Sequence, residues 1–160
     1  MIFRQAKSRE IDSILDEGYK VWSKGRTRER YLEDNREEDA YGARYIIEES
    51  GVIVSSLILL RLKQVCNRET CGIGSVLTPS IHMHRGYATS LITSCLEHIT
   101  DREGYIFLYS EIAPSFYEKF GFIVLPPALQ KSKAPCMVLC GEKAWSELTN
   151  LSVDQIPDYF

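Results

Sequence analysis

The chain has 160 residues, of which 44% are hydrophobic and 26% are charged, and its formal net charge is −3 at pH 7. These values are ordinary for a folded domain, and they exclude a disordered chain or a collagen-like repeat. A mildly acidic chain is also a poor candidate for binding nucleic acid, which favours a basic surface.

The length predicts a single domain over residues 1–160, and no membrane-spanning or export segment is expected. The apolar stretch Leu57–Leu60 falls far short of the roughly 20 residues that cross a bilayer. The N-terminal segment becomes charged at Arg4 and lacks the apolar core of a signal peptide. We therefore expect a cytoplasmic protein without a membrane partner, and a homodimer is compatible with the sequence.

The first part of the chain alternates between strand and helix patterns. Ile2–Gln5 is predicted as a short opening strand. Apolar residues recur at helical spacing over Ser8–Lys24, with Ser8 as the candidate N-cap, and Gly25 follows. Arg26–Asp39 is dense in charge and is predicted to form a short exposed helix followed by a loop.

Three strands are expected next. Ala43–Glu48 is the first, and Val52–Val65 follows after a turn, with apolar residues on both sides, as in a strand covered on both faces. Cys71–Thr78 is the third strand and contains Gly72 and Gly74. Glycines inside a strand indicate a bulge or a close approach by a ligand.

The second half of the chain begins with a helix and continues with shorter elements. A helical stripe starts at Ala88 and ends near Asp101. The further predicted elements are strand Tyr105–Tyr109, short helix Pro114–Phe120, strands Phe122–Leu125 and Cys136–Cys140, and a tail over residues 141–160 with a helical turn at Ala144–Leu148. This order predicts an α/β fold of the α+β type, with helices packed on a mixed sheet.

The five cysteines do not form a recognisable framework. They are Cys66, Cys71, Cys95, Cys136 and Cys140. Their number is odd, and the two close pairs lack the C-x2-C spacing of common zinc sites. We expect reduced thiols and no bound metal.

The loop between strand Cys71–Thr78 and the following helix carries the most informative pattern. The first turn of a helix presents unpaired backbone N–H groups at the positive end of the helix dipole, where a pyrophosphate can bind. Gly86 would let the backbone approach such a ligand, and Arg85 adds a positive charge. The alternative is an ordinary connection in which Gly86 only relieves crowding.

The segment Val76–Ala88 resembles the acetyl-CoA-binding motif of the GNAT superfamily, the Gcn5-related N-acetyltransferases. The family pattern is Arg or Gln, two residues, Gly, one residue, and then Gly or Ala; here it runs from Met83 through Gly86 to Ala88. Met83 departs from the Arg or Gln of the family, and nearby basic side chains could compensate.

A second segment, Ser110–Phe122, resembles the family pattern A-x-x-F-Y-E-K-x-G-F. The residues in register are Ala113, Phe116, Tyr117, Gly121 and Phe122. With the elements around the two motifs, the resemblance covers roughly Ile2 to Cys140, and it is weaker for the lysine N6-acetyltransferase branch. It implies a largely antiparallel central sheet with helices on both faces, and acetyl-CoA as cosubstrate.

The resemblance also implies roles for individual residues. Those implied to bind the cofactor are Val76, Leu77, Thr78, Met83, His84, Arg85, Gly86, Tyr87, Ala88 and Ser110. Ser110 replaces the Asn that is frequent in the family, and its hydroxyl could still bond the pantetheine arm. Tyr117 matches the tyrosine that protonates the leaving thiolate; the alternative is that its ring only packs against the sheet.

The sequence does not identify the general base. Histone-type relatives use a glutamate on the fourth strand, and the matching position here is near Gly72, which has no side chain. Glu111 is the leading candidate, ahead of Glu69 and His82, but a solvated surface role is favoured for each of the three, and a base acting through ordered water is a further alternative. The acidic run Glu29–Asp39 would attract a cationic acceptor if it bordered the acceptor site, but a solvated face is favoured.

The resemblance therefore implies an N-acetyltransferase that moves an acetyl group to a primary amine of a small molecule or a lysine-like acceptor. The attack would be direct, in a ternary complex. The alternative is an acyl-CoA-binding regulatory domain without turnover. A third reading, a toxin that acetylates charged tRNA, conflicts with the acidic pI near 5.7.

Overall fold

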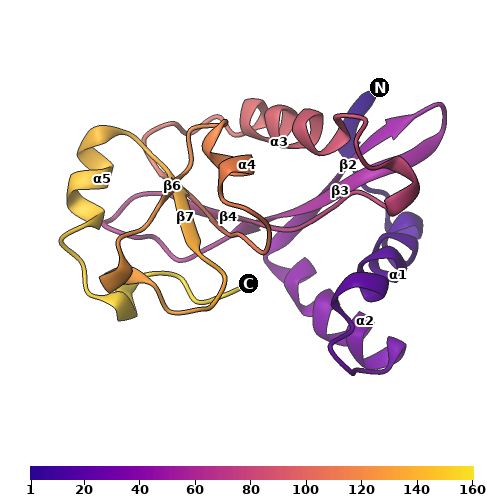
Figure 1. The fold of residues 1–160 in the computed structure, drawn as a ribbon, viewed down its shortest axis with the longest axis horizontal. Coiled ribbons are helices and arrows are strands. Elements are labelled where there is room, and N and C mark those ends of the chain that lie inside the picture. Colours follow the sequence, from indigo (N-terminus) through magenta and orange to yellow (C-terminus); the bar gives the residue numbers. More distant parts are fainter. The chain divides into compact units, whose positions relative to one another are not determined.

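The computed structural model describes residues 1–160 and contains a seven-stranded sheet in the order β1-β2-β3-β4-β5-β7-β6 (Figure 1). The strands are β1 Ile2–Gln5, β2 Gly42–Glu49, β3 Val52–Arg61, β4 Thr70–Leu77, β5 Tyr105–Tyr109, β6 Ile123–Val124 and β7 Cys136–Leu139. Strands β4 and β5 pair in parallel, whereas β1–β2, β2–β3, β5–β7 and β6–β7 pair antiparallel. The predicted mixed and largely antiparallel sheet is confirmed.

Five α-helices and five short 3₁₀ helices accompany the sheet. The α-helices are α1 Ile11–Trp22, α2 Arg28–Arg36, α3 Tyr87–His98, α4 Ser115–Glu118 and α5 Glu142–Leu148. The 3₁₀ helices are η1 Ser8–Glu10, η2 Glu37–Ala40, η3 Ser80–His82, η4 Pro127–Leu129 and η5 Val153–Gln155. None of these helices combines the length and the apolar character that a membrane crossing requires.

The chain divides into two compact units. Unit 1 comprises Met1–Leu60 and Ser75–His98, and unit 2 comprises Arg61–Gly74 and Ile99–Phe160. That residues 1–160 act as one domain stays a prediction.

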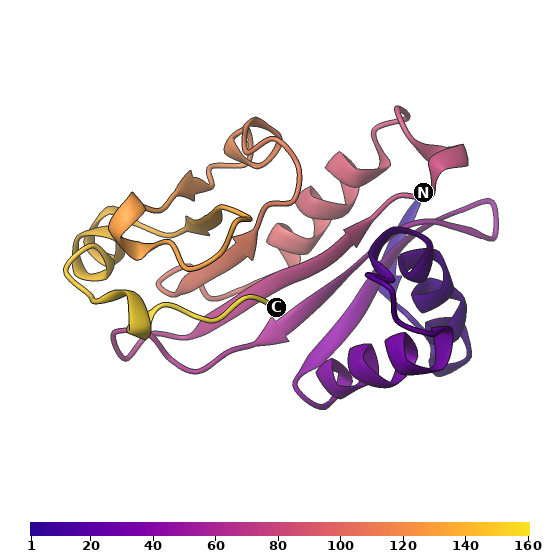
Figure 2. The same cartoon turned by 60° about the horizontal axis from the view of Figure 1, so that its bottom comes forward.

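Unit 1 packs helices on both sides of its strands. Figure 2 shows α1 and α2 together on one side of β1–β3 and α3 on the other. Its buried core includes Ile14 and Leu15 of α1, Ile46 of β2, and Leu91 and Ile92 of α3. These apolar residues fall at helical or strand spacing, so the same periodicity that predicted the elements also forms the core.

Unit 2 has an aromatic core built on β5. Tyr105 and Phe107 are almost fully buried there, together with Val138 of β7 and Leu148 of α5. The Tyr105 hydroxyl donates a hydrogen bond to the Ala144 carbonyl at 2.7 Å, which satisfies its polar group and fixes α5 on the sheet.

Several predicted boundaries were wrong by a few residues, and the start of the first α-helix and the end of β3 are two of them. The first α-helix begins at Ile11, because Ser8 lies in η1 and provides no cap; the Glu10 carboxylate instead accepts a hydrogen bond from the Lys7 N–H at 2.7 Å. Strand β3 ends at Arg61 and not at Val65; Val65 instead forms an isolated bridge with Arg68 across a turn at Cys66 and Asn67, which both have positive φ.

Glu10 also ties the first strand to the first helix. Both of its carboxylate oxygens accept hydrogen bonds from Arg4, each at 2.8 Å, and Arg4 also donates to Glu48 of β2. The Arg4 guanidinium, followed by the Lys7 N–H, lowers the pKa of Glu10 to about 2. Since the folded-state pKa is depressed, the stabilisation is present above pH 4.5 and is lost as the pH falls towards 2.

We expect Glu10→Gln to lower the free energy of unfolding by about 1 kcal/mol at pH 7, a value discounted for solvent screening. The difference from the wild type should shrink as the pH falls from about 4.5 to about 2, where both chains lack the charge. Urea unfolding at a series of pH values measures this. Glu17→Gln, which removes only an exposed pairing with Lys20, is the control. A Glu10 effect that does not change with pH would contradict the assignment.

Candidate functional site

Strand β4 is irregular at its centre. Ser75 has φ +48, a left-handed conformation that is costly for a residue with a side chain. The parallel ladder to β5 ends at the pair Gly72–Phe107, although β5 continues to Tyr109. The irregular residue is therefore Ser75, and neither Gly72 nor Gly74 has a positive φ.

Gly72 has a role that was not predicted for it. A Cβ on Gly72 would lie 2.6 Å from the Phe160 ring, a distance that real Cβ atoms do not show. The glycine therefore makes room for an aromatic side chain of the same chain. A bulge or a close approach by a ligand at this glycine stays a prediction.

The predicted pantetheine-binding residues Val76, Leu77 and Thr78 are anchored to β3. The Ser55 hydroxyl donates to the Leu77 carbonyl at 2.9 Å and shares a hydrogen bond of the same length with the Thr78 hydroxyl. Ser55 is completely buried. We had not identified Ser55 from the sequence, although a polar residue inside the apolar run of β3 was the available signal.

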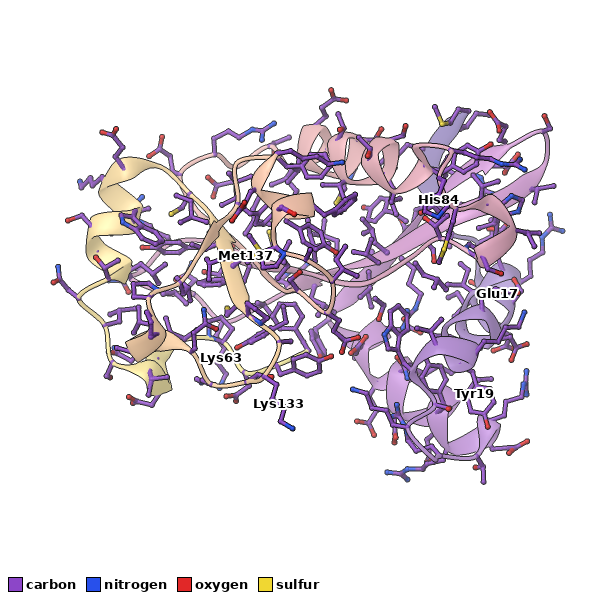
Figure 3. The ribbon with its side chains drawn as sticks, in the orientation of Figure 1. Glu17, Tyr19, Lys63, His84, Lys133 and Met137 are labelled. Carbon is purple, nitrogen blue, oxygen red and sulfur yellow. The ribbon has the colours of Figure 1, made fainter.

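The loop from Met83 to Gly86 is exposed and leads directly into α3. His84, labelled in Figure 3, and Gly86 have φ values of +61 and +80. A Cβ built on Gly86 meets no atom within 4 Å, so this side of the loop is open. A left-handed glycine with open space beside it, immediately before a helix of 12 residues, is compatible with close approach of a phosphate group.

Tyr87 and Ala88, the motif residues on the first turn of α3, are less exposed than the loop before them. Tyr87 is 8% exposed, and its hydroxyl donates a hydrogen bond to the Glu49 carboxylate, which raises the pKa of Tyr87. The Tyr87 side chain is therefore held by a contact within unit 1, so its backbone groups, and not its hydroxyl, are available to a ligand. Ala88 is half-buried on the first turn of α3.

His82 lies just before the loop, in η3. Its ring meets the Tyr87 ring edge-on at 6.2 Å, and its Nδ1 is buried without a hydrogen-bond partner. Met83, which stands where the family has Arg or Gln, is 47% exposed. The surface of the loop therefore presents an apolar side chain at this position.

Tyr117 lies in α4 of unit 2 and is 6% exposed. Its ring packs edge-on against Phe116 at 5.0 Å and against Phe122 at 6.2 Å. Burial, followed by the negative charge of Glu111, raises the pKa of Tyr117 to about 12. The phenol is protonated at neutral pH, as it also is at the ordinary tyrosine pKa of 10.0.

Glu111 and Ser110 precede α4 in the same unit. Glu111 is exposed, and its carboxylate accepts a hydrogen bond from the Tyr159 hydroxyl. Ser110 is 2% exposed, and its hydroxyl donates to the Ile112 carbonyl at 2.8 Å. The proton of Ser110 is thus engaged, and only its acceptor capacity is open to a ligand.

The acidic run after α1 is largely paired with arginines. Asp34 pairs with Arg26 at 2.9 Å, and Asp39 pairs with Arg44 at 2.9 Å. Glu33 pairs with exposed Arg30. This pairing neutralises much of the local charge, which favours the structural reading over attraction of a cationic acceptor.

The other candidate groups gather into no metal site. None of the five cysteines forms a disulfide, and no group of three or more His, Cys, Asp or Glu side chains could hold a metal ion. Glu69, another candidate base, is exposed and accepts a hydrogen bond from Gln64 at 2.6 Å.

The family model described as an acetyltransferase (GNAT) domain matches residues 3–125. The chain belongs to this family and is an N-acetyltransferase. A sequence comparison with curated proteins gave no match.

Several solved structures share the fold at low sequence identity. A histone acetyltransferase HPA2 and related acetyltransferase from Corynebacterium glutamicum aligns over 85% of this chain and 93% of its own, with 15% identity and a TM-score of 0.66. An aminoglycoside 6'-N-acetyltransferase complexed with coenzyme A aligns over 87% and 96%, with 14% identity and a TM-score of 0.66.

A probable N-acyltransferase from Enterococcus faecalis has 16% identity and a TM-score of 0.66, and this chain spans 31% of its length. Identities this low establish the common fold and leave the acceptor to be argued from the residues of this chain.

Proposed function

We propose that this protein transfers the acetyl group of acetyl-CoA to a primary amine by direct attack in a ternary complex. The observation that carries the proposal is Tyr117, a buried phenol on the short helix α4, near enough to Glu111 for the charge of that carboxylate to act on it.

In this proposal the cofactor is held largely by backbone groups. Those at Val76, Leu77 and Thr78 would pair with the pantetheine amides in the manner of an added strand. The exposed loop, Met83–Gly86, and the first turn of α3 at Tyr87 and Ala88 would surround the pyrophosphate. His84 and Arg85 would add polar and positive side chains, and Ser110 would accept a hydrogen bond from the pantetheine arm.

The chemistry requires three proton transfers. Glu111 would receive a proton from the acceptor ammonium, which frees the nitrogen lone pair to form the new bond to the acetyl carbon. As the carbon–sulfur bond breaks, Tyr117 would donate its proton to the thiolate, and the nitrogen would lose its second proton to water, which leaves a neutral amide. Water would then return a proton to Tyr117 and take one from Glu111, so that both groups recover their starting state and one proton is released overall.

The favoured acceptor is a cationic primary amine of a small molecule, or a lysine-like side chain. Glu111 is exposed beside the buried acid, and a carboxylate there favours an ammonium group over a neutral or anionic acceptor. This argument does not depend on the acidic residues near α2, which are paired with arginines.

A thiol-release assay with acetyl-CoA and a panel of amines tests the proposal. We expect release of free CoA that depends on a cationic primary amine, together with the acetylated amine as product. Tight binding of CoA without turnover on any amine would instead favour the acyl-CoA-binding regulatory module.

A further inference from the structure

The segment Ile156–Phe160 is fixed on unit 2 through its backbone. Lys131 Nζ donates to the Ile156 carbonyl at 2.5 Å, and the Tyr109 hydroxyl donates to the Pro157 carbonyl at 2.5 Å. Figures 1 and 2 show this yellow segment running from the last helical turn to the C-terminus. These contacts hold the backbone in place, so the side chains that follow have defined positions.

The Phe160 ring fills the space left by the missing side chain of Gly72. Two of its carbons lie 2.6 and 2.7 Å from where a Cβ of Gly72 would be. The ring also packs edge-on against Tyr109 of β5, with centroids 5.5 Å apart. Phe160 therefore covers the end of the β4–β5 ladder, where Gly72 pairs with Phe107.

Tyr159 connects this segment to the proposed proton-transfer groups. Its ring meets the Tyr109 ring at 5.2 Å, and its hydroxyl donates to the Glu111 carboxylate. The charge of Glu111 acts in turn on Tyr117. Aromatic rings, a carboxylate and the buried phenol thus occupy one neighbourhood within unit 2.

Such a neighbourhood suits an alkylammonium ion. Aromatic faces attract cations, and a carboxylate adds a charge-assisted hydrogen bond. Tyr159 is 45% exposed, so it is accessible from solvent, whereas Tyr109 is 9% exposed and forms the inner side.

We propose that Tyr159 and Phe160 are specificity-determining residues that form an aromatic wall of the acceptor site and select a small primary alkylammonium. This inference rests on the proposed function. Tyr159 would face the cation and position Glu111 through its hydroxyl. Phe160 would limit the depth of the site and so exclude bulkier amines.

The first test compares a cationic with a neutral acceptor, 1,4-diaminobutane with aniline. We expect Tyr159→Ala to raise the KM for 1,4-diaminobutane by about tenfold and to change the KM for aniline and for acetyl-CoA by less than about twofold. Tyr159→Phe keeps the ring and loses the hydroxyl. It should therefore retain most of the affinity for the diamine while lowering kcat through a less well positioned Glu111.

Asp158→Asn is the matched control in the same segment. The substitution removes one charge from a side chain that is 94% exposed and forms an ion pair with Lys131. The kinetics should therefore stay at the wild-type level. Thermal unfolding of each variant verifies that it is folded.

The second test addresses the size of the site. Phe160→Ala should lower the preference for 1,4-diaminobutane over benzylamine, measured as the ratio of kcat/KM values, by about tenfold. Gly72→Ala should act in the same direction, because its Cβ would displace the same ring.

The inference fails if Tyr159→Ala and Phe160→Ala leave the acceptor kinetics unchanged in an otherwise active enzyme; the proposed function would then stand without it. If the wild type acetylates no amine, the proposed function fails instead. Calorimetric titration of wild type and Tyr159→Ala with 1,4-diaminobutane then decides the inference by itself, since only a loss of affinity in the variant agrees with it.

Discussion

Replacing Tyr117 with phenylalanine is expected to reduce turnover by roughly 10²–10⁴-fold, the usual span for a positioned general acid. The variant loses a proton donor and almost no volume, so the edge-on contacts with Phe116 and Phe122 should persist. The fall should appear in kcat more than in KM, because the proton is needed as the leaving sulfur develops charge. Steady-state kinetics with acetyl-CoA and a cationic amine measure both.

The control for this variant is Tyr19→Phe, which removes the hydroxyl that donates to the Arg26 carbonyl in unit 1. Its turnover should equal that of the wild type. A Tyr117→Phe enzyme with normal kcat would show that water protonates the thiolate. Loss of CoA binding would indicate a role in folding or in the cofactor site.

The raised pKa of Tyr117 also sets the pH dependence of the acid. A phenol with a pKa of about 12 is protonated throughout the neutral range and loses its proton only as the pH rises towards that value. Deprotonation of Tyr117 should therefore not reduce the activity of the wild type below about pH 10. Any alkaline decline in that range should also appear in Tyr117→Phe.

The second large effect is expected at Gly86. Proline there cannot adopt φ +80, and it removes a backbone N–H from the open side of the loop. Together the lost conformation and the lost donor should raise the Kd for CoA by about 10²-fold or more. Isothermal titration calorimetry with CoA gives the value directly.

A pair of alanine variants separates strain from cofactor binding. Gly25 has φ +78, and like Gly86 it has no atom within 4 Å of a built Cβ. Gly25→Ala and Gly86→Ala should therefore cost similar stability, yet only Gly86→Ala should weaken CoA. Equal CoA affinities in the two variants would contradict the placement of the pyrophosphate at this loop.

Much of the fold follows from local patterns in the sequence. Tyr105–Tyr109 was predicted with the observed bounds, because a run of aromatic and branched residues has one strong preference. The motif residues Gly86 and Tyr117 lie on the loop and the short helix expected for them.

The parts that were missed depend on contacts between distant residues. The role of Gly72 can be seen only once it is known that Phe160, which is 88 positions later in the chain, lies against it. The contact between Tyr159 and Glu111 is equally non-local. No periodicity encodes such pairs, because periodicity reports only which face of its own element a residue occupies.

The hydrogen bonds of Ser55 have a consequence for the order of folding. They join Ser55 to Leu77 and Thr78, at sequence separations of 22 and 23 residues, so they form only after that stretch of chain has closed into a loop. Ser75 lies just before, in a conformation that its own side chain disfavours. Local preference therefore does not shape this part of β4, and we expect it to acquire its geometry after β3 is in place. Damage to the β3–β4 connection would then appear as weakened cofactor binding in a chain whose helices are already formed.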